Sequence, residues 1–346
     1  MKNKGKPFAL SSPIKSEASM KSPKGAYAAS RAFHYKFSAG YLDGAAQLAQ
    51  WLSVGLAARR GEEPADFLRK NGITPYYVHE SSWRESARPL DLILWPVPAL
   101  PWVVEEAREK IYFLEKILKK RMVPSFSQIM LFRHFPHQYA FLKARGLPMV
   151  PAFITYDYDE ACRYVQEAEM PLLCRREQEL QFIREEVLLT RREAKKMAFD
   201  AFRLGIPGLW PGHRDKQCII LMKAPEKEDL RGTFLYAGAY AFFGYGSRSS
   251  QVDQDFEQRL WGLACRVRAL GLRDAIIEFR INRNSGALLL ETAHPLFPGA
   301  PYVFSPRNRC SSDESPRSAE IEREFPDVEQ ILMEGLLRDE LKNYEA

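Results

Sequence analysis

Helical and strand-like hydrophobic patterns alternate along the first third of the chain. Apolar residues at helical spacing predict a helix over 45–60, with Gly61 as its stop. Further helices are expected over 64–70 and 102–120. Short apolar runs that predict strands lie at 74–79, 90–95 and 122–126. Because strands and helices alternate, we expect a small open α/β domain at 28–126.

The middle of the chain continues with a mixture of helix and strand patterns. Residues 127–145 predict a helix. Strands at 150–156 and 170–175 flank a predicted helix at 157–169. The charged stretch 176–196 contains neither glycine nor proline, which favours a helix, or a helix and a strand, over a loop.

From residue 217 onward the pattern changes to apolar runs of strand length. These runs lie at 219–223, 232–237, 239–243, 276–281 and 287–292. A helical pattern over 253–270 separates the third run from the fourth. We therefore expect an antiparallel sheet with one packed helix, so that the chain combines an α/β part with an α+β part.

The last two predicted strands carry one glutamate each and are joined by a turn rich in Asn, Ser and Gly. If the turn comprises 283–286, Glu278 lies directly opposite Glu291, with the two Cβ atoms ~5 Å apart. Like charges at that distance repel each other unless a cation lies between them. Mg²⁺ bound by carboxylates and nucleotide phosphates meets this requirement, so both glutamates are candidate metal ligands.

Two other arrangements of these glutamates are open. A turn of five residues would pair Glu278 with Leu290 and direct Glu291 to the other face of the hairpin. Alternatively, Glu278 forms an ion pair with a neighbouring base such as Arg280 and binds no metal. Spacing alone does not separate these possibilities.

An arginine stands just ahead of a predicted strand in the sequence Asp229-Leu230-Arg231. Its planar guanidinium group can hold phosphate or carboxylate oxygens with two parallel hydrogen bonds. The same spacing also suits a local ion pair between Asp229 and Arg231, so the motif alone is weak evidence for a phosphate site.

Five segments follow one another in an informative order. They are Gly-Leu-Pro-Met-Val-Pro at 146–151, Pro-Leu-Leu-Cys-Arg at 171–175, Asp-Leu-Arg at 229–231, Tyr-Ala-Gly-Ala at 236–239 and Leu-Glu-Thr-Ala at 290–293. Over 127–298 this order resembles the ATP-grasp superfamily of carboxylate-amine ligases, which includes glutathione synthetase and D-alanine-D-alanine ligase. The resemblance implies a two-lobed ATP-grasp module at 127–310, with its smaller lobe at about 165–222, after the α/β domain.

The resemblance also implies an activity and roles for individual residues. ATP would phosphorylate a substrate carboxylate, and an amine would then displace the phosphate. The implied cofactors are ATP and Mg²⁺, and the implied substrates are small-molecule or peptide carboxylates and amines. The roles fall on Arg175, Lys223 and Arg231 for the nucleotide, on Glu278 and Glu291 for Mg²⁺, and on Arg231 and Arg248 for catalysis, with Arg248 holding the substrate carboxylate.

The sequence departs from the family pattern at four points. Ala293 stands where the family has a metal-binding asparagine, and 176–189 lacks the glycines of a phosphate-binding loop. The adenine-binding hinge is replaced by the segment around Lys223, and the first family lysine falls near Arg133 or His134. These departures leave open a second interpretation, a degenerate ATP-grasp protein that binds a nucleotide, a peptide or a protein partner without catalysis.

Charge is concentrated at the ends of the chain. Residues 1–36 carry eight lysines and arginines against one glutamate, and 311–346 carry eleven acidic residues against four basic ones. We expect a disordered basic leader at 1–27 and an acidic tail with a C-terminal helix at 311–346. A third interpretation is therefore a binder of anionic surfaces or nucleic acid through the N-terminal lysines. The lack of a helix with interleaved aromatics in the leader argues against nucleic acid.

Cysteine usage and hydropathy bear on the compartment and on partners. The five cysteines are widely spaced without a Cys-x-x-Cys pair, which favours a reducing cytoplasm. The sequence shows neither a signal peptide nor an apolar stretch of membrane-spanning length. Apolar residues at Val328, Ile331, Leu332 and Leu336 predict an amphipathic helix that docks on the body or on a second copy in a homodimer.

Overall fold

The computed structural model describes residues 39–60, 65–97, 101–131, 134–175, 185–207, 214–215, 217–226, 229–237, 240–245, 254–282, 285–298 and 328–345. All of them belong to one compact unit that spans Tyr35–Ala346. The predicted leader at 1–27, the first part of the predicted acidic tail and Arg248 lie outside the described residues.

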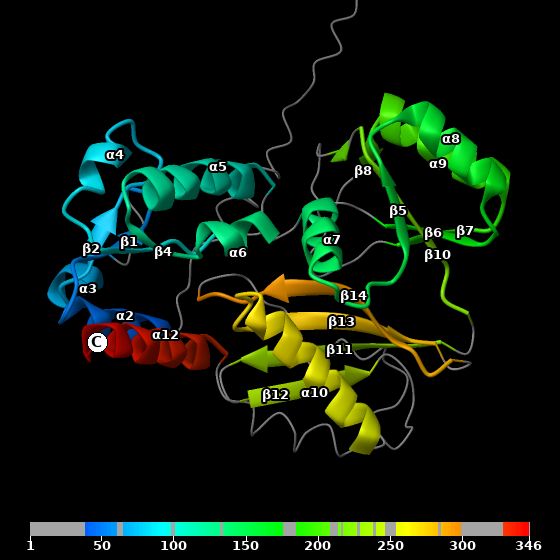
Figure 1. Cartoon of the computed structure of the whole chain (residues 1–346). Helices are drawn as coiled ribbons and strands as arrows, with labels where there is room; N and C mark the ends of the chain where they lie inside the picture. Colours follow the sequence, from blue (N-terminus) through cyan, green and yellow to red (C-terminus); the bar gives the residue numbers. More distant parts are fainter. Residues whose placement is uncertain are drawn as a thin grey trace, which may run out of the picture. The chain divides into compact units, whose positions relative to one another are not determined.

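A parallel four-stranded sheet forms the first part of this unit (Figure 1). Its strands are β1 (Val54–Ala57), β2 (Thr74–Tyr76), β3 (Leu92–Leu94) and β4 (Arg121–Val123), in the order β2-β1-β3-β4. The accompanying helices are α2 (Ala39–Ala49), α3 (Ala65–Lys70), α4 (Trp83–Ser86), α5 (Pro101–Tyr112) and the π-helical turn η1 (Phe113–Ile117). The alternation of helix and strand thus predicted an open parallel sheet correctly.

Strand β1 lies where hydrophobic spacing predicted the second half of a helix over 45–60. Helix α2 ends at Ala49, and the four residues of β1, which pairs with β2 and β3, are all buried. A central parallel strand is covered on both faces, so its sequence shows no alternation that would distinguish it from a helix. The predicted helix over 45–60 was therefore wrong in its second half, because a short apolar run fits a buried strand as well as a helix.

Residues 127–145 form two helices instead of the single one predicted. They are α6 (Phe126–Leu131) and α7 (Phe135–Ala144), and Pro136 lies in the first turn of α7. Proline is tolerated there because the N–H groups of a first helical turn have no acceptor within the helix. Pro136 therefore favours a new helix start near residue 135.

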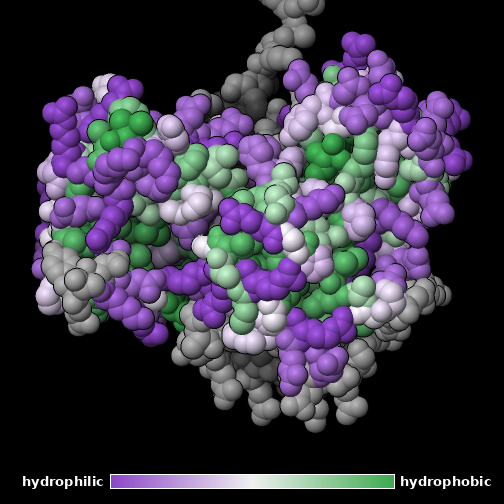
Figure 2. Space-filling model, viewed as in Figure 1, coloured by the Kyte–Doolittle hydropathy of each residue, from purple (hydrophilic) through white to green (hydrophobic). Residues whose placement is uncertain are grey.

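A smaller antiparallel sheet has the strand order β5-β10-β6-β7. Its strands are β5 (Ala152–Thr155), β6 (Leu172–Arg175), β7 (Glu186–Leu188) and β10 (Ile219–Lys223), and helices α8 (Tyr158–Glu167) and α9 (Arg191–Arg203) pack on it. The short pair β8 (Ile206–Pro207) and β9 (Arg214–Asp215) follows α9. The solvent faces of α8 and α9 are mostly hydrophilic (Figure 2). Strand β10 was expected in the same sheet as the later strands, and this assignment is corrected.

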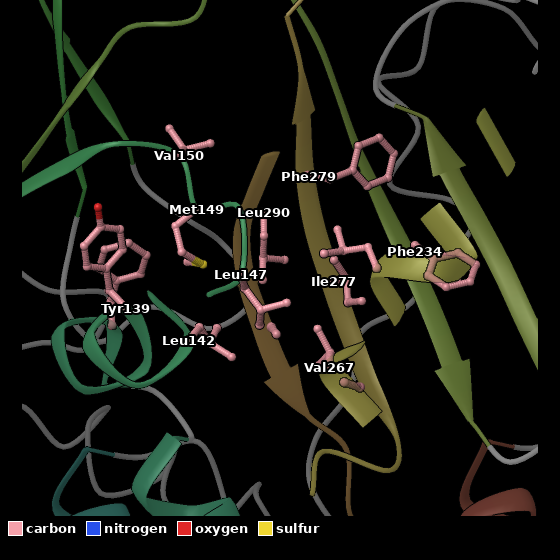
Figure 3. Packing of buried hydrophobic residues seen from close by; sticks show 14 of the residues in the cluster. Tyr139, Leu142, Leu147, Met149, Val150, Phe234, Val267, Ile277, Phe279 and Leu290 are labelled. Atoms are coloured by element: carbon pink, nitrogen blue, oxygen red, sulfur yellow. The ribbon is translucent and has the colours of Figure 1, made fainter. Parts of the chain in front are cut away.

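The larger antiparallel sheet has the order β12-β11-β13-β14 and carries α10 (Gln254–Ala269) on one face. Its strands are β11 (Leu230–Ala237), β12 (Tyr240–Tyr245), β13 (Ala275–Ile281) and β14 (Leu288–Pro295). Phe234, Ile277, Phe279 and Leu290 point from this face into a core that also takes Val267 of α10 (Figure 3). Apolar residues of α7 join the same core, which places the start of α7 next to β14.

The C-terminal helix α12 (Val328–Glu345) packs on the body of the same chain, one of the two predicted alternatives. Ile331 and Leu332 lie against the face of the larger sheet that α10 leaves uncovered. Met333 packs with α2, and ion pairs join Arg121 to Glu340 and Arg273 to Asp339. One helix therefore contacts both the parallel and the larger antiparallel part. Among the described residues, no helix has the length and apolar character needed to cross a membrane.

Two leucines of α12 provide a matched test of this packing. Leu332 is 1% exposed and Leu341 is 44% exposed. We expect Leu332→Ala to lower the free energy of unfolding by about 2–5 kcal/mol, because it removes buried contacts and leaves a cavity. Leu341→Ala should change it by less than about 0.5 kcal/mol. Urea unfolding followed by circular dichroism measures both, and equal losses would contradict the packing.

Candidate functional site

The β13-β14 hairpin changes its register in the middle. Next to the turn the pairing is the one expected for a four-residue loop, with Phe279 opposite Leu290. The register then shifts at a β-bulge, so that Glu278 pairs with Thr292 and Glu291 becomes the extra residue. The predicted pairing of Glu278 with Glu291 is therefore wrong, and so is the alternative pairing with Leu290.

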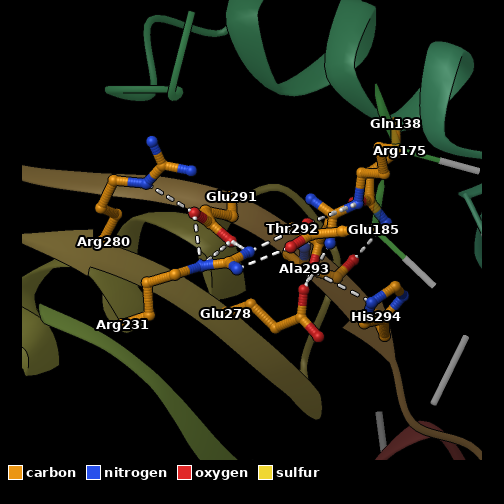
Figure 4. A network of polar contacts seen from close by, with 10 residues as sticks. All are labelled: Gln138, Arg175, Glu185, Arg231, Glu278, Arg280, Glu291, Thr292, Ala293 and His294. Carbon is orange, nitrogen blue, oxygen red and sulfur yellow. Dashed lines mark hydrogen bonds and ion pairs between the residues drawn. The ribbon is translucent and has the colours of Figure 1, made fainter. Parts of the chain in front are cut away.

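The bulge determines which side chains of β14 reach the polar face of the sheet. Leu290 and Ala293 are both fully buried in the core beneath α10, whereas Glu291 and Thr292 between them contact polar partners. Strict alternation would instead have placed Ala293 on the same face as Glu291. Ala293, the residue in the place of the family asparagine, therefore points away from the polar cluster. His294 lies on the polar face, with Nε2 3.0 Å from the Thr292 hydroxyl (Figure 4).

Glu291 is held by two arginines from neighbouring strands. Arg231 of β11 donates from Nε to both carboxylate oxygens at 3.0 and 3.1 Å, and its Nη2 contacts the same carboxylate. Arg280 of β13 donates from Nε to Glu291 at 2.8 Å. The side chain of Glu291 is 1% exposed and that of Arg280 is 5% exposed, so their ion pair is buried, whereas Arg231 is 33% exposed. Figure 4 shows both arginines directed at this carboxylate. A buried charge of this kind persists only when it is paired.

Arg175 at the end of β6 links the smaller sheet to the same cluster. It donates from Nη2 to Glu278 at 2.7 Å, and its guanidinium lies over the Phe135 ring at 4.8 Å. Thr292 also donates to Glu278, at 2.8 Å. Glu185, just ahead of β7, completes the group through Arg231. The formal charges cancel within the cluster, which consists of Arg175, Arg231, Arg280, Glu185, Glu278 and Glu291.

These contacts set the protonation of Glu291 and Arg231. Burial alone would raise the pKa of Glu291, but the positive charge and hydrogen bonds of Arg231, together with Arg280 and Arg175, lower it below the usual value. Burial would likewise lower the pKa of Arg231, but its bonds to Glu185 and Glu291 raise it above the usual value. Both groups are therefore charged at neutral pH.

Two guanidinium groups each have one buried nitrogen that donates no hydrogen bond to the described residues. Nη1 of Arg175 and Nη2 of Arg280 have no hydrogen-bond partner within the described parts of the chain. The two side chains are 3% and 5% exposed. An unsatisfied buried donor of a charged group is costly, so an anion that reached these atoms would be bound favourably.

The predicted nucleotide residue Lys223 contributes through its backbone. Its carbonyl oxygen accepts a hydrogen bond from Nη1 of Arg280 at 3.0 Å. Its ammonium group pairs with Glu226 and Glu169 and is well exposed. The end of β10 is thus connected to the cluster, while the Lys223 side chain lies among exposed carboxylates. Arg248, predicted to hold a substrate carboxylate, lies outside the described residues.

Glu278 and Glu291 offer only oxygen atoms as ligands for Mg²⁺. Across the described ranges, no group of three or more His, Cys, Asp or Glu side chains is arranged to hold a metal. Glu278, which accepts from the Thr292 hydroxyl, and Glu291 supply two carboxylates, and Mg²⁺ commonly takes one or two carboxylates when nucleotide phosphates complete its shell. The oxygen-only donor set fits Mg²⁺ that arrives with a nucleotide.

The order of the sheets defines the fold. An α/β domain precedes two antiparallel sheets, and arginines and glutamates from both sheets meet in one network. This arrangement is the ATP-grasp fold, which the order of sequence segments predicted.

Two solved structures are similar to this chain in fold. N5-carboxyaminoimidazole ribonucleotide synthetase from Thermotoga maritima matches with a TM-score of 0.51 and 12% identity, over 77% of this chain and 67% of that chain. An ADP complex of the same kind of synthetase matches with a TM-score of 0.50 and 12% identity, over 74% and 67%. No protein-family model matches the sequence, and no curated protein matches it.

The charge of Glu291 provides a test of the network. Glu291→Gln preserves volume but leaves the buried Arg280 without a counter-charge, while Arg231 keeps Glu185, so we expect the free energy of unfolding at pH 7 to fall by about 3–5 kcal/mol. Glu169→Gln, at a side chain that is 85% exposed, should cost less than about 0.5 kcal/mol.

The stability of Glu291→Gln should also depend on pH differently from that of the wild type. The pKa of Glu291 is lowered in the folded state from a reference value of 4.5, so its stabilisation is complete above pH 4.5 and is lost as pH falls through the folded pKa. Urea unfolding between pH 7 and pH 3 should therefore show a shallower acid loss for Glu291→Gln than for the wild type. If the free energies of unfolding of the two proteins fall in parallel with pH, Glu291 is not an ionised member of the network.

Proposed function

We propose that the chain is an ATP-dependent carboxylate-amine ligase that acts through an acyl phosphate. The observation that carries the proposal is that Arg175 and Arg280 each have a buried N–H donor without an acceptor among the described residues. Phosphate oxygens are strong acceptors for guanidinium groups. An ATP-grasp fold with such donors beside two carboxylates suits a nucleotide polyphosphate better than a neutral ligand.

In this proposal Arg175 and Arg231 bind and orient the phosphates, and Arg231 also stabilises the charge that develops during transfer. Arg280 keeps Glu291 in place and joins it to the Lys223 carbonyl at the end of β10. Lys223 would line the nucleotide site at this strand end. Arg248 is proposed to hold the substrate carboxylate.

Glu278 and Glu291 are the proposed holders of Mg²⁺. When bound, this ion would supply positive charge that offsets the charge of the phosphates. The two carboxylates now contact Arg175, Arg231 and Arg280. Arginines that turn toward phosphate oxygens would leave carboxylate oxygens available, so nucleotide and metal binding are expected to depend on each other.

The proposed reaction has two displacements. An oxygen of the substrate carboxylate attacks the γ-phosphorus, and ADP leaves with the electrons of the broken bond. The amine nitrogen then attacks the acyl carbon, phosphate leaves, and the nitrogen gives up a proton to solvent. No side-chain nucleophile is required, so the protein contributes positioning and charge stabilisation. The substrates would be small-molecule or peptide carboxylates and amines, and the proposed location is the cytoplasm.

A degenerate ATP-grasp protein is the second candidate. The observation that favours it is the charge balance of the cluster, in which each carboxylate already has an arginine partner. Such a protein would bind a nucleotide without turnover. The two candidates differ in whether ADP and phosphate are released.

ATP binding is tested by thermal and urea unfolding with and without Mg²⁺. ATP at about 100 times its dissociation constant should stabilise the native protein by about 2.7 kcal/mol. Glu278→Gln should lose the increment that Mg²⁺ adds, because one carboxylate ligand is removed, whereas Glu169→Gln should retain it.

Turnover is tested by measuring ADP and phosphate release with mixtures of amino acids and dipeptides. Release that requires both a carboxylate and an amine supports the ligase, and binding without release supports the degenerate alternative. Absence of any nucleotide-dependent stabilisation at millimolar ATP would refute the ligase and the nucleotide-binding form of the degenerate alternative.

A further inference from the structure

Glu185 occupies one side of the Arg231 guanidinium group. Its two carboxylate oxygens accept from Nη1 at 2.6 Å and from Nη2 at 2.9 Å, a parallel, bidentate arrangement. Its Oε1 also lies 3.9 Å from Nε of Arg175. Glu185 thus faces both arginines that the proposed function assigns to the phosphates (Figure 4).

Arg231 has no unused edge for an incoming phosphate. A guanidinium group presents two edges that can each hold a bidentate anion. Glu291 takes the edge formed by Nε and Nη2, and Glu185 takes the edge formed by Nη1 and Nη2. A phosphate that binds Arg231 with two hydrogen bonds must therefore displace one of these carboxylates.

Glu185 is the carboxylate that can leave. Glu291 is almost fully buried and also holds Arg280, which would lose its charged partner. Glu185 is 10% exposed and precedes the short edge strand β7 of the smaller sheet. Its removal would leave Arg231 still paired with Glu291.

We propose that Glu185 is a specificity-determining residue, an internal carboxylate that competes with phosphate for Arg231 and is displaced only by ligands with a bidentate, multiply charged anionic group. This inference rests on the proposed function. Polyphosphate ligands meet the requirement, because they offer several oxygens and more than one negative charge. Adenosine, which has no anionic group, does not.

The test compares the full-length wild type with Glu185→Gln by calorimetric titration of ATP and of inorganic pyrophosphate. The amide keeps the volume but not the charge, so we expect both dissociation constants to fall by about tenfold, a change of about 1.4 kcal/mol. Adenosine affinity should not change. Glu186→Gln is the matched control, because the neighbouring Glu186 is exposed and its loss removes the same charge from the chain.

Glu185→Ala is a second variant that guards against a folding defect of the first, and its expected change has the same direction. Unchanged or weaker pyrophosphate binding in both variants would overturn the inference, and so would an equal gain in Glu186→Gln. If pyrophosphate binding tightens while ATP binds neither protein, the inference stands and the proposed ligase fails. If ATP binds the wild type and neither variant differs from it, the ligase stands and Glu185 is not a competitor.

Discussion

The pairing of six charged side chains, three of them fully buried, at the junction of two sheets is the constraint on which this molecule depends. A charge inside a protein costs several kcal/mol unless a partner of opposite sign lies close by with good geometry. The three arginines and three glutamates meet that condition only when β6 of the smaller sheet approaches β11, β13 and β14 of the larger one. The network therefore adds electrostatic contacts between two sheets that also share an apolar cluster, to which Leu173 of β6 and Phe234 of β11 both belong.

The bulge at Glu291 makes this network compatible with a packed core. Because of the bulge, the consecutive residues Glu291 and Thr292 both point to the polar face, while Leu290 and Ala293 both pack in the core beneath α10. A regular strand would have to expose one apolar residue or bury one more polar residue. A one-residue irregularity in a strand thus decides the composition of the whole cluster.

Local patterns in the sequence predicted much of this architecture. The features that could not be predicted depend on contacts between residues far apart in the sequence. The alternation in the first third predicted a parallel sheet, and the Asn/Ser/Gly turn predicted the pairing next to it, in which Asn282 donates to the carbonyl of Ala287. The bulge could not be predicted, because it follows from a balance between core and polar partners on several strands. Arg280 was expected near the site because it lies two residues from Glu278 and hence on the same face, but it pairs with Glu291 and not with Glu278. Glu185 could not, because its partner Arg231 belongs to a different sheet.

The C-terminal helix has a consequence for the order in which the molecule is completed. α12 covers apolar residues of α2, near the start of the described chain, and of the larger sheet. Until α12 has left the ribosome, those surfaces stay open to water and to other chains. Termination of synthesis before α12 would therefore release a polypeptide with exposed apolar surfaces on two of its parts, a substrate for chaperones and proteases.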